Sequence, residues 1–117
     1  YIEYANARIS SILNSYKEEL PKITKFNTLN EPLAYTIMDK LINFEDTVIT
    51  AAEKEQHHII CNYIYELASL FHSYYSQVKF ITDDKEYTNE RMILLQAIKI
   101  VINNSLNLIG IIPREQM

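Results

Sequence analysis

The sequence has almost no glycine: Gly110 is the single one among 117 residues. A sheet protein with tight hairpins usually needs several glycines at turn positions with positive φ, and a phosphate-binding loop needs more than one. The scarcity of glycine therefore favours helices and argues against a nucleotide-binding strand–turn–helix unit.

Cysteine is equally rare, with Cys61 alone. One cysteine excludes a disulfide within the chain, which suits a reducing compartment and predicts a cytoplasmic protein. It also excludes a zinc site built on paired cysteines. Because a single cysteine inside a helix is usually a small core residue, we expect Cys61 to be buried and without a catalytic role.

An excess of positive charge is missing too, since the formal net charge is −4. A protein that binds nucleic acid mainly through its phosphates is usually basic, so the composition argues mildly against RNA. The sequence has neither a run of about 18 uncharged apolar residues nor a basic stretch followed by an apolar one at its start. We therefore expect no membrane span and no secretory signal. Tyr1 is not a natural start residue, which predicts that residues 1–117 are a single domain of a longer protein.

Apolar residues three or four positions apart predict helices along most of the chain. The first predicted helix runs from Tyr1 to about Glu19. The second begins with Asn30 as its N-cap. A short third helix covers residues 48–52. Whether the second and third are one bent helix or two stays open at this stage, because an interruption at Asn43 or just after it fits either.

The last two predicted helices are the longest. The fourth starts near His57 and carries an apolar stripe about five turns long, and the fifth runs from about Thr88 to Gly110, which suits a helix C-cap. Five helical segments with short connections and no strand pattern predict an all-α fold, a helical bundle. The stripe of the fourth segment consists of Ile60, Ile64, Leu67, Ala68, Phe71, Tyr75 and Val78.

The usual catalytic constellations are missing from the sequence. No metalloprotease helix motif, nucleophile elbow or P-loop occurs. His57 and His58 are adjacent, so they point to different faces of a helix, and His72 lies several turns further on. We interpret all three as surface or helix-end residues. The chain is therefore predicted to contain no catalytic residue, no metal site and no cofactor of its own.

Two arginines stand out from the solvated charged face. Arg8 lies among apolar residues of the first predicted helix, and Arg91 lies at the start of the fifth. An arginine in such a place can hold carboxylates or carbonyls of a neighbouring helix, or it can contact phosphate. Spacing alone favours the structural role for both.

Tyrosine is the abundant aromatic residue, with nine tyrosines and no tryptophan. A tyrosine can fill a core while its hydroxyl stays wet, and this interpretation covers most of the nine. Exposed aromatic rings that converge in space can instead stack unpaired bases, at about 1–3 kcal/mol per base. Tyr1 and Tyr4, one helical turn apart, and Tyr75 are candidates. Because base stacking needs no net positive charge, a net charge of −4 is only a partial argument against RNA binding.

Four stretches, in order along the chain, resemble one family. Residues 1–12, YIEYANARISSI, are similar to the YVQYAHARICSI stretch that opens the anticodon-binding domain of arginyl-tRNA synthetases. Residues 62–75 resemble that domain's Tyr-Leu-x-Glu-Leu-Ala and Phe-His-x-x-Tyr helix. Residues 90–95 resemble its Arg-Leu-x-Leu motif, and residues 106–117 its Leu-x-Leu-Leu-Gly-Ile…Pro-Glu-x-Met end. Each motif is weak alone, but together they cover the whole chain.

The resemblance implies an all-helical domain of a class I synthetase, which joins arginine to its tRNA with ATP and Mg²⁺. It implies that Tyr1, Tyr4, Tyr75 and Met117 surround the anticodon bases, and we count Arg8 with them as a candidate contact. The expected partners are the anticodon loop of an arginine-specific tRNA and an upstream catalytic domain of the same chain. Neither DNA nor a membrane is expected as a partner.

Two departures qualify what the resemblance implies. Asn6 stands where the family often has a histidine, which puts any contact made by that imidazole in doubt. The family's catalytic signatures, His-Ile-Gly-His and Lys-Met-Ser-Lys-Ser, do not occur in the sequence, so the chain alone is expected to be inactive. The acidic charge keeps a second hypothesis open: a helical protein-interaction domain without RNA binding.

Overall fold

The computed structural model describes residues 1–110, and this part of the chain forms five α-helices and no strand. The predicted all-α class and the predicted number of helices are confirmed. The helices are α1 (Ile2–Ser15), α2 (Pro32–Ile42), α3 (Phe44–Lys54), α4 (His58–Gln77) and α5 (Lys85–Ile109).

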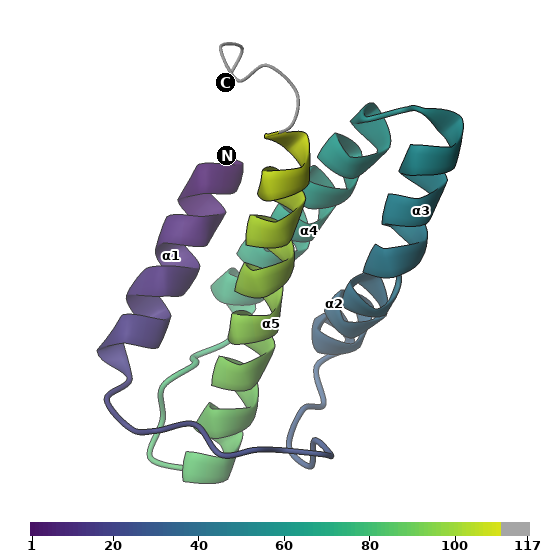
Figure 1. The fold of residues 1–117 in the computed structure, drawn as a ribbon. Helices are drawn as coiled ribbons and strands as arrows, with labels where there is room; N and C mark the ends of the chain where they lie inside the picture. Colours follow the sequence, from purple (N-terminus) through teal and green to yellow (C-terminus); the bar gives the residue numbers. More distant parts are fainter. Residues whose placement is uncertain (111–117) are drawn as a thin grey trace.

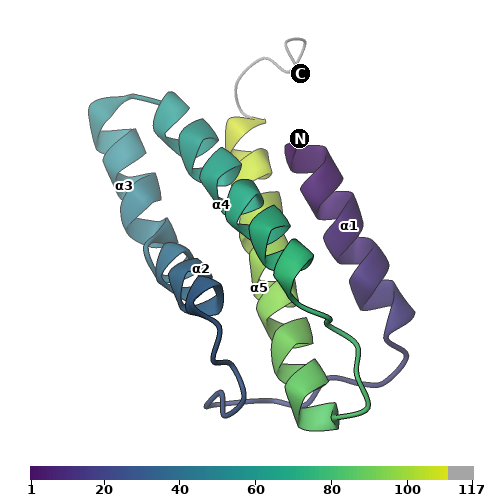
Figure 2. The ribbon, with the colours of Figure 1, turned by 180° about the vertical axis from the view of Figure 1, so that it is seen from behind.

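The two longest helices, α4 and α5, form the spine of the bundle (Figure 1). Helix α1 packs against both on one side, and α2 and α3 follow one another along the opposite side of α4, an arrangement also visible from behind (Figure 2). The start of α1 lies at the same end of the bundle as the C-terminal end of α5 (Figure 1). Helix α1, from the start of the sequence, and helix α5, from its end, thus both pack against α4.

The buried face of α4 contains five residues of the predicted stripe and, in addition, Tyr63 and Tyr74; Val78 lies just beyond the helix and is half-buried. Tyr74 is fully buried, whereas Tyr75, which was predicted in the stripe, is 38% exposed. The Tyr74 ring packs edge-on against Phe80, with centroids 5.4 Å apart, and its hydroxyl donates a hydrogen bond to Oε1 of Glu31, 2.9 Å away. Residue 74 therefore continues the core face, while residue 75, one step further round the helix, turns outward on the side of α1.

Helix α1 ends at Ser15, earlier than the predicted end near Glu19. Tyr16 already has an extended backbone, with φ −91° and ψ 110°. Its hydroxyl donates to Oδ1 of Asn89 on α5, 2.6 Å away. The predicted end was wrong: the chain leaves the helix where Tyr16 bonds to Asn89 on α5, a distant contact that local periodicity does not predict.

The start of α2 also differs from the prediction, because Glu31 rather than Asn30 is the N-cap residue. The Glu31 side chain does not cap the helix: Nη2 of Arg91 lies 2.7 Å from its Oε2. The interruption after α2 falls at Asn43, which is the C-cap of α2 and the N-cap of α3. The question left open by the sequence is thus settled in favour of two helices.

Helix α5 starts at Lys85, three residues before the predicted start. Asp84 is its N-cap, and the Asp84 carboxylate accepts a hydrogen bond from the backbone N–H of Tyr87, 3.2 Å away. This is the preferred N-cap chemistry, which satisfies one of the free N–H groups of the first turn. Residues 85–87, which precede the predicted start, therefore belong to the first turn of the helix.

Arg91 has the structural role that its spacing favoured. It is fully buried, and besides its ion pair with Glu31 it donates to the carbonyl and the hydroxyl of Thr28, 2.9 and 3.0 Å away. The guanidinium also lies 3.4 Å from the ring centroid of Tyr87. A buried charge needs this degree of pairing, and the pairing ties the segment before α2 to α5.

Two further expectations can be compared with the described residues. Cys61 is exposed, so its predicted place in the core is wrong. Its position on α4 lies outside the buried face. Helix α5 is long and apolar enough, by length and composition only, to cross a membrane. The same composition is typical of a core helix, and α5 packs against α1, α2 and α4.

Candidate nucleic-acid interface

Three large side chains lie on one side of α1 and its N-cap: Tyr1 and Tyr4 are exposed, and Arg8 is half-buried. Tyr1, Tyr4 and Arg8 lie three and four positions apart, which places them on the same side of a helix. Ala5 and Ile9 are fully buried and hold α1 on the bundle. Burial of this second face therefore fixes the direction in which the two tyrosines and the arginine project.

An aromatic side chain of α4 lies between these two tyrosines. The imidazole centroid of His72 is 4.9 Å from the ring centroid of Tyr1 and 5.5 Å from that of Tyr4, the latter in a stacked arrangement. On the other side of Tyr1 lies Tyr65, also on α4, with centroids 5.1 Å apart. These distances lie within the 4.5–7 Å at which aromatic pairs attract one another.

Arg8 joins the rings of the two helices. Its guanidinium carbon lies 4.1 Å from the ring centroid of Tyr75 and 4.5 Å from that of Tyr4. Its Nη2 donates to the Tyr4 hydroxyl, and its Nη1 lies 3.4 Å from Nδ1 of His72. A planar guanidinium suits such a place because it stacks on aromatic faces while donating in its own plane.

These contacts form a continuous surface feature, which we call the aromatic row. Its tyrosines keep much of their surface open to solvent, with exposed fractions between 38% and 58%. The row thus offers ring faces and edges while the core beneath it is closed. In spatial order its members are Tyr65, Tyr1, His72, Tyr4, Arg8 and Tyr75.

His72 is held in its neutral form within the row. Partial burial lowers the pKa of the imidazole below its usual 6.5, the Arg8 guanidinium lowers it further, and the Tyr1 backbone acts more weakly in the opposite direction. Because arginine can only donate, Nδ1 of His72 is the acceptor of the contact with Arg8. Among the side chains of the row, the positive charge near neutral pH therefore lies on Arg8.

The structure brings together four of the five site residues predicted from the sequence: Tyr1, Tyr4, Arg8 and Tyr75. The fifth, Met117, lies outside the described residues. Within residues 1–110 Arg8 forms no ion pair, so the structural role that spacing favoured for it is replaced by contacts to rings.

Sequence reasoning missed two members of the row, His72 and Tyr65. His72 was interpreted only as a surface or helix-end residue; it is half-buried in the middle of the row, and its contacts with Tyr1 and Tyr4 were not predicted. The seven-residue spacing from Tyr65 to His72 could have placed both on one face of α4. Asn6 lies elsewhere: its Nδ2 donates to Oδ1 of Asn103 on α5, 3.3 Å away, so the position at which the family often has a histidine faces α5.

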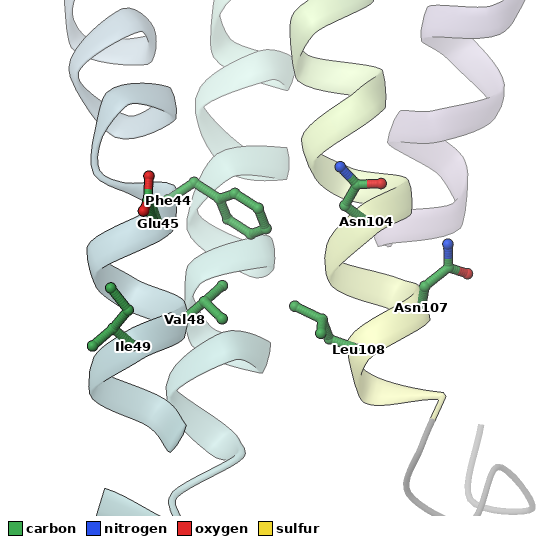
Figure 3. A pocket seen from close by; sticks show the side chains of 7 residues that line it. All are labelled: Phe44, Glu45, Val48, Ile49, Asn104, Asn107 and Leu108. Carbon is green, nitrogen blue, oxygen red and sulfur yellow. The ribbon is translucent and has the colours of Figure 1, made fainter. Parts of the chain in front are cut away.

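A cavity of about 550 Å³ lies away from the row, between α3 and α5. Figure 3 shows side chains of the two helices pointing toward one another across it, among them Phe44, Val48 and Leu108. Its described lining contains no cation, and the carboxylate of Glu45 contributes negative charge. This cavity is therefore poorly suited to a phosphate backbone. Within residues 1–110, no group of three or more His, Cys, Asp or Glu residues is placed to hold a metal ion.

Comparison with known proteins gives the same family over nearly the whole chain. The chain is 38% identical over 120 residues to the arginine–tRNA ligases of Staphylococcus aureus (strain USA300 / TCH1516) and Staphylococcus epidermidis (strain ATCC 12228 / FDA PCI 1200). The alignment covers 100% of this chain and 22% of each ligase, so the chain spans about a fifth of the length of these relatives. The model of the DALR anticodon binding domain matches residues 2–117, and the chain belongs to that family.

Proposed function

We propose that the aromatic row binds unpaired bases of a tRNA anticodon loop, and that the chain is the anticodon-binding part of an arginine–tRNA ligase. The observation that carries the proposal is the convergence of Tyr1, Tyr4, Arg8 and Tyr75 from two helices onto one exposed surface. In an anticodon loop the bases are free to leave their stack and lie on aromatic or guanidinium planes. The row supplies both kinds of plane side by side.

The charge of the domain fits this mode of binding. Stacking gives about 1–3 kcal/mol per base without any cation, so a net charge of −4 is no obstacle to recognition of a few bases. The Tyr4 hydroxyl, which accepts from Arg8, and the Arg8 guanidinium lie beside the ring faces, where they can donate to base edges or to phosphate. The Tyr1 hydroxyl donates to Ser69 and can accept from a base edge. Met117, by the family resemblance, is proposed to complete this surface.

The remaining functions belong, in this proposal, to the longer ligase. Activation of arginine with ATP and Mg²⁺ and transfer to the tRNA take place in an upstream catalytic domain of the same chain. The anticodon-binding domain contributes selection of arginine-specific tRNA in the cytoplasm, and DNA and membranes are not its partners. Without the catalytic domain it is inactive as an enzyme.

The direct test is titration of this chain with the anticodon stem-loop of an arginine tRNA and with a stem-loop of altered anticodon. We expect tighter binding of the arginine stem-loop. In the complete ligase, Tyr75→Ala should raise the KM for tRNA by about 5- to 150-fold, the range equivalent to one base stack, with little change in the KM for arginine or ATP. Unchanged aminoacylation kinetics over a range of tRNA concentrations would contradict the role of Tyr75.

A second candidate function, a protein-interaction domain without RNA binding, is favoured by the apolar lining of the α3–α5 cavity and by the acidic charge. Its occupant would be the rest of a longer polypeptide, because relatives of this chain are several times its length. The two candidates are separated by Tyr75→Ala and Val48→Asp in the ligase. Unchanged tRNA binding in both variants, with a less stable ligase only in Val48→Asp, would favour the second.

A further inference from the structure

A second cavity begins where the aromatic row ends. It lies between α2 and α4, has a volume of about 450 Å³, and falls within the roughly 300–1,000 Å³ of small-ligand sites. We call it the α2–α4 groove. Its polar and aromatic lining consists of Thr36 and Lys40 from α2 and Tyr65, Glu66, Ser69 and Ser73 from α4.

The groove and the row share a wall. The Tyr65 ring packs against Tyr1 in a tilted arrangement, with centroids 5.1 Å apart, and Tyr65 also lines the groove. The Tyr1 hydroxyl donates to Oγ of Ser69, 3.2 Å away, and Ser69 lines the groove as well. A strand that follows the row from Tyr75 toward Tyr1 therefore arrives at the groove next.

The groove contains the groups that a nucleotide needs. Tyr65 is 56% exposed, so its ring offers a face for a base. Ser69 accepts from Tyr1, so its own hydroxyl proton remains available to a ribose or phosphate oxygen. Ser69 and Ser73 lie one helical turn apart, opposite Thr36 on α2. Three hydroxyls are thereby distributed along the two walls of the groove.

Lys40 provides the positive charge among the described residues that line the groove, and an acidic residue competes for it. Its ammonium lies 3.2 Å from Oε2 of Glu66 and 4.8 Å from the ring centroid of Tyr63. The Lys40 side chain is 22% exposed and the Glu66 side chain 62% exposed. Because the Glu66 carboxylate is open to solvent, the ion pair is screened, and a phosphate can take the place of that carboxylate beside the half-buried Lys40 ammonium.

We propose that the α2–α4 groove binds an unpaired nucleotide that adjoins the anticodon triplet in the tRNA loop. Its base stacks on Tyr65, its phosphate pairs with Lys40, and its ribose contacts the serine and threonine hydroxyls. The proposal rests on the proposed function of the aromatic row, which it extends by one nucleotide. Tyr65 occupies the variable position of the Tyr-Leu-x-Glu-Leu-Ala motif, so this subsite is a feature of this sequence rather than of the motif.

The test uses this chain and three synthetic RNAs: the arginine anticodon stem-loop, and the same stem-loop with an abasic ribose on either side of the triplet. Tyr65→Ala should weaken binding of the intact loop by about 5- to 150-fold, the range that one stacked base supports. One of the two abasic loops should bind weakly to the wild type and show no further loss with Tyr65→Ala. Tyr65→Phe, which keeps the ring, should retain wild-type affinity.

Two variants test the charges of the groove. Lys40→Met should weaken binding, whereas Glu66→Gln, which removes the competing carboxylate, should strengthen it. Tyr35→Ala serves as a matched control, because Tyr35 is 53% exposed on α2 but does not line the groove. It should bind like the wild type, and circular dichroism should report the same helix content for all variants.

The outcomes distinguish this proposal from the proposed function. If Tyr75→Ala weakens binding but Tyr65→Ala does not, the groove proposal fails while the row remains a base-binding surface. Equal losses from Tyr65→Ala on the intact and both abasic loops would likewise overturn it, because Tyr65 would then act only by supporting Tyr1. If the wild-type chain does not distinguish the arginine stem-loop from one of altered anticodon, both proposals fail.

Discussion

Arg8 contacts three members of the aromatic row. It lies over Tyr4 and Tyr75 and donates toward Nδ1 of His72. A lysine in this position would keep the charge but lose the plane that stacks on two rings and the fixed direction of its donors. The substitution Arg8→Lys therefore separates the effect of charge on RNA binding from the effect of side-chain geometry.

We predict that Arg8→Lys weakens binding of the arginine anticodon stem-loop by about 5- to 30-fold. This range corresponds to roughly 1–2 kcal/mol for two partly exposed cation–π contacts. The measurement is fluorescence anisotropy at fixed ionic strength. Lys17→Met is the control: it removes a positive charge from α1's C-terminal side, outside the row, and should change affinity less. Wild-type affinity in Arg8→Lys would show that charge alone matters.

At the level of single residues, features that depend on the geometry of one helix were predicted from the sequence. Features that depend on how two helices pack against each other were missed. The common face of Tyr1, Tyr4 and Arg8 follows from spacing within α1. Which of Tyr74 and Tyr75 faces the core depends on how α4 is rotated against its neighbours. His72 was misinterpreted because its partners, two tyrosines more than 60 residues away in sequence, become visible only after α1 has packed on α4.

Among the elements, the segment before α2 depends on α5 for its position. The Glu90 carboxylate accepts hydrogen bonds from the backbone N–H groups of Asn27, Thr28 and Leu29, at 2.8, 2.8 and 3.2 Å. Glu31 pairs with Arg91, the residue that follows Glu90 on α5. Two carboxylates thus link an irregular segment to a long helix.

These carboxylates predict loss of stability in acid. Burial raises the pKa of Glu31 and Glu90, but hydrogen bonds, and for Glu31 also the Arg91 charge, outweigh it, so each pKa lies below the usual 4.5. A carboxyl whose pKa is lower in the folded state stabilises the fold above its unfolded pKa. That stability is lost as the pH falls through the folded pKa. Urea unfolding should therefore show a constant contribution from these groups above about pH 4.5 and a decline below it.

Glu90→Gln tests the contribution of one group. We expect the variant to lose about 1–3 kcal/mol of unfolding free energy at pH 7, because the buried N–H donors lose a charged acceptor, and to show a flatter decline between pH 4.5 and 3. Glu53→Gln, an exposed position on α3, should behave like the wild type. Equal acid slopes in Glu90→Gln and wild type would rule out Glu90 as a source of the decline.

Element ends were the least predictable part of the fold for a related reason. Number, order and type of the helices follow from apolar periodicity, which the chain carries locally. The end of α1 and the start of α2 depend on Tyr16 with Asn89 and on Glu31 with Arg91, pairs that lie 73 and 60 residues apart. No local signal for such pairs exists in the sequence. The start of α5 was an avoidable error, because Asp84 is a good N-cap residue.

For the molecule as a whole, charge and fold set the way in which RNA can be bound. The row joins residues 1–8 to residues 65–75 and offers rings together with the Arg8 guanidinium. The α2–α4 groove adds Lys40. With a net charge of −4, the remainder of the surface gives no general attraction for phosphates. Affinity must then come mainly from stacking and from hydrogen bonds to base edges.

This balance predicts a shallow dependence of RNA affinity on salt. Release of counterions from single-stranded nucleic acid gives a slope of log Kobs against log salt of about −0.7 for each phosphate neutralised, so one or two contacts give about −0.7 to −1.4. The measurement is stem-loop titration between low and moderate potassium chloride. Tyr75→Ala should lower affinity at every salt concentration without changing the slope, whereas Arg8→Met should make the slope shallower by about 0.7.

A slope of about −4 or steeper would mean that roughly six phosphates are neutralised. Binding would then be dominated by the backbone, and the rings of the row would not be its main source of affinity.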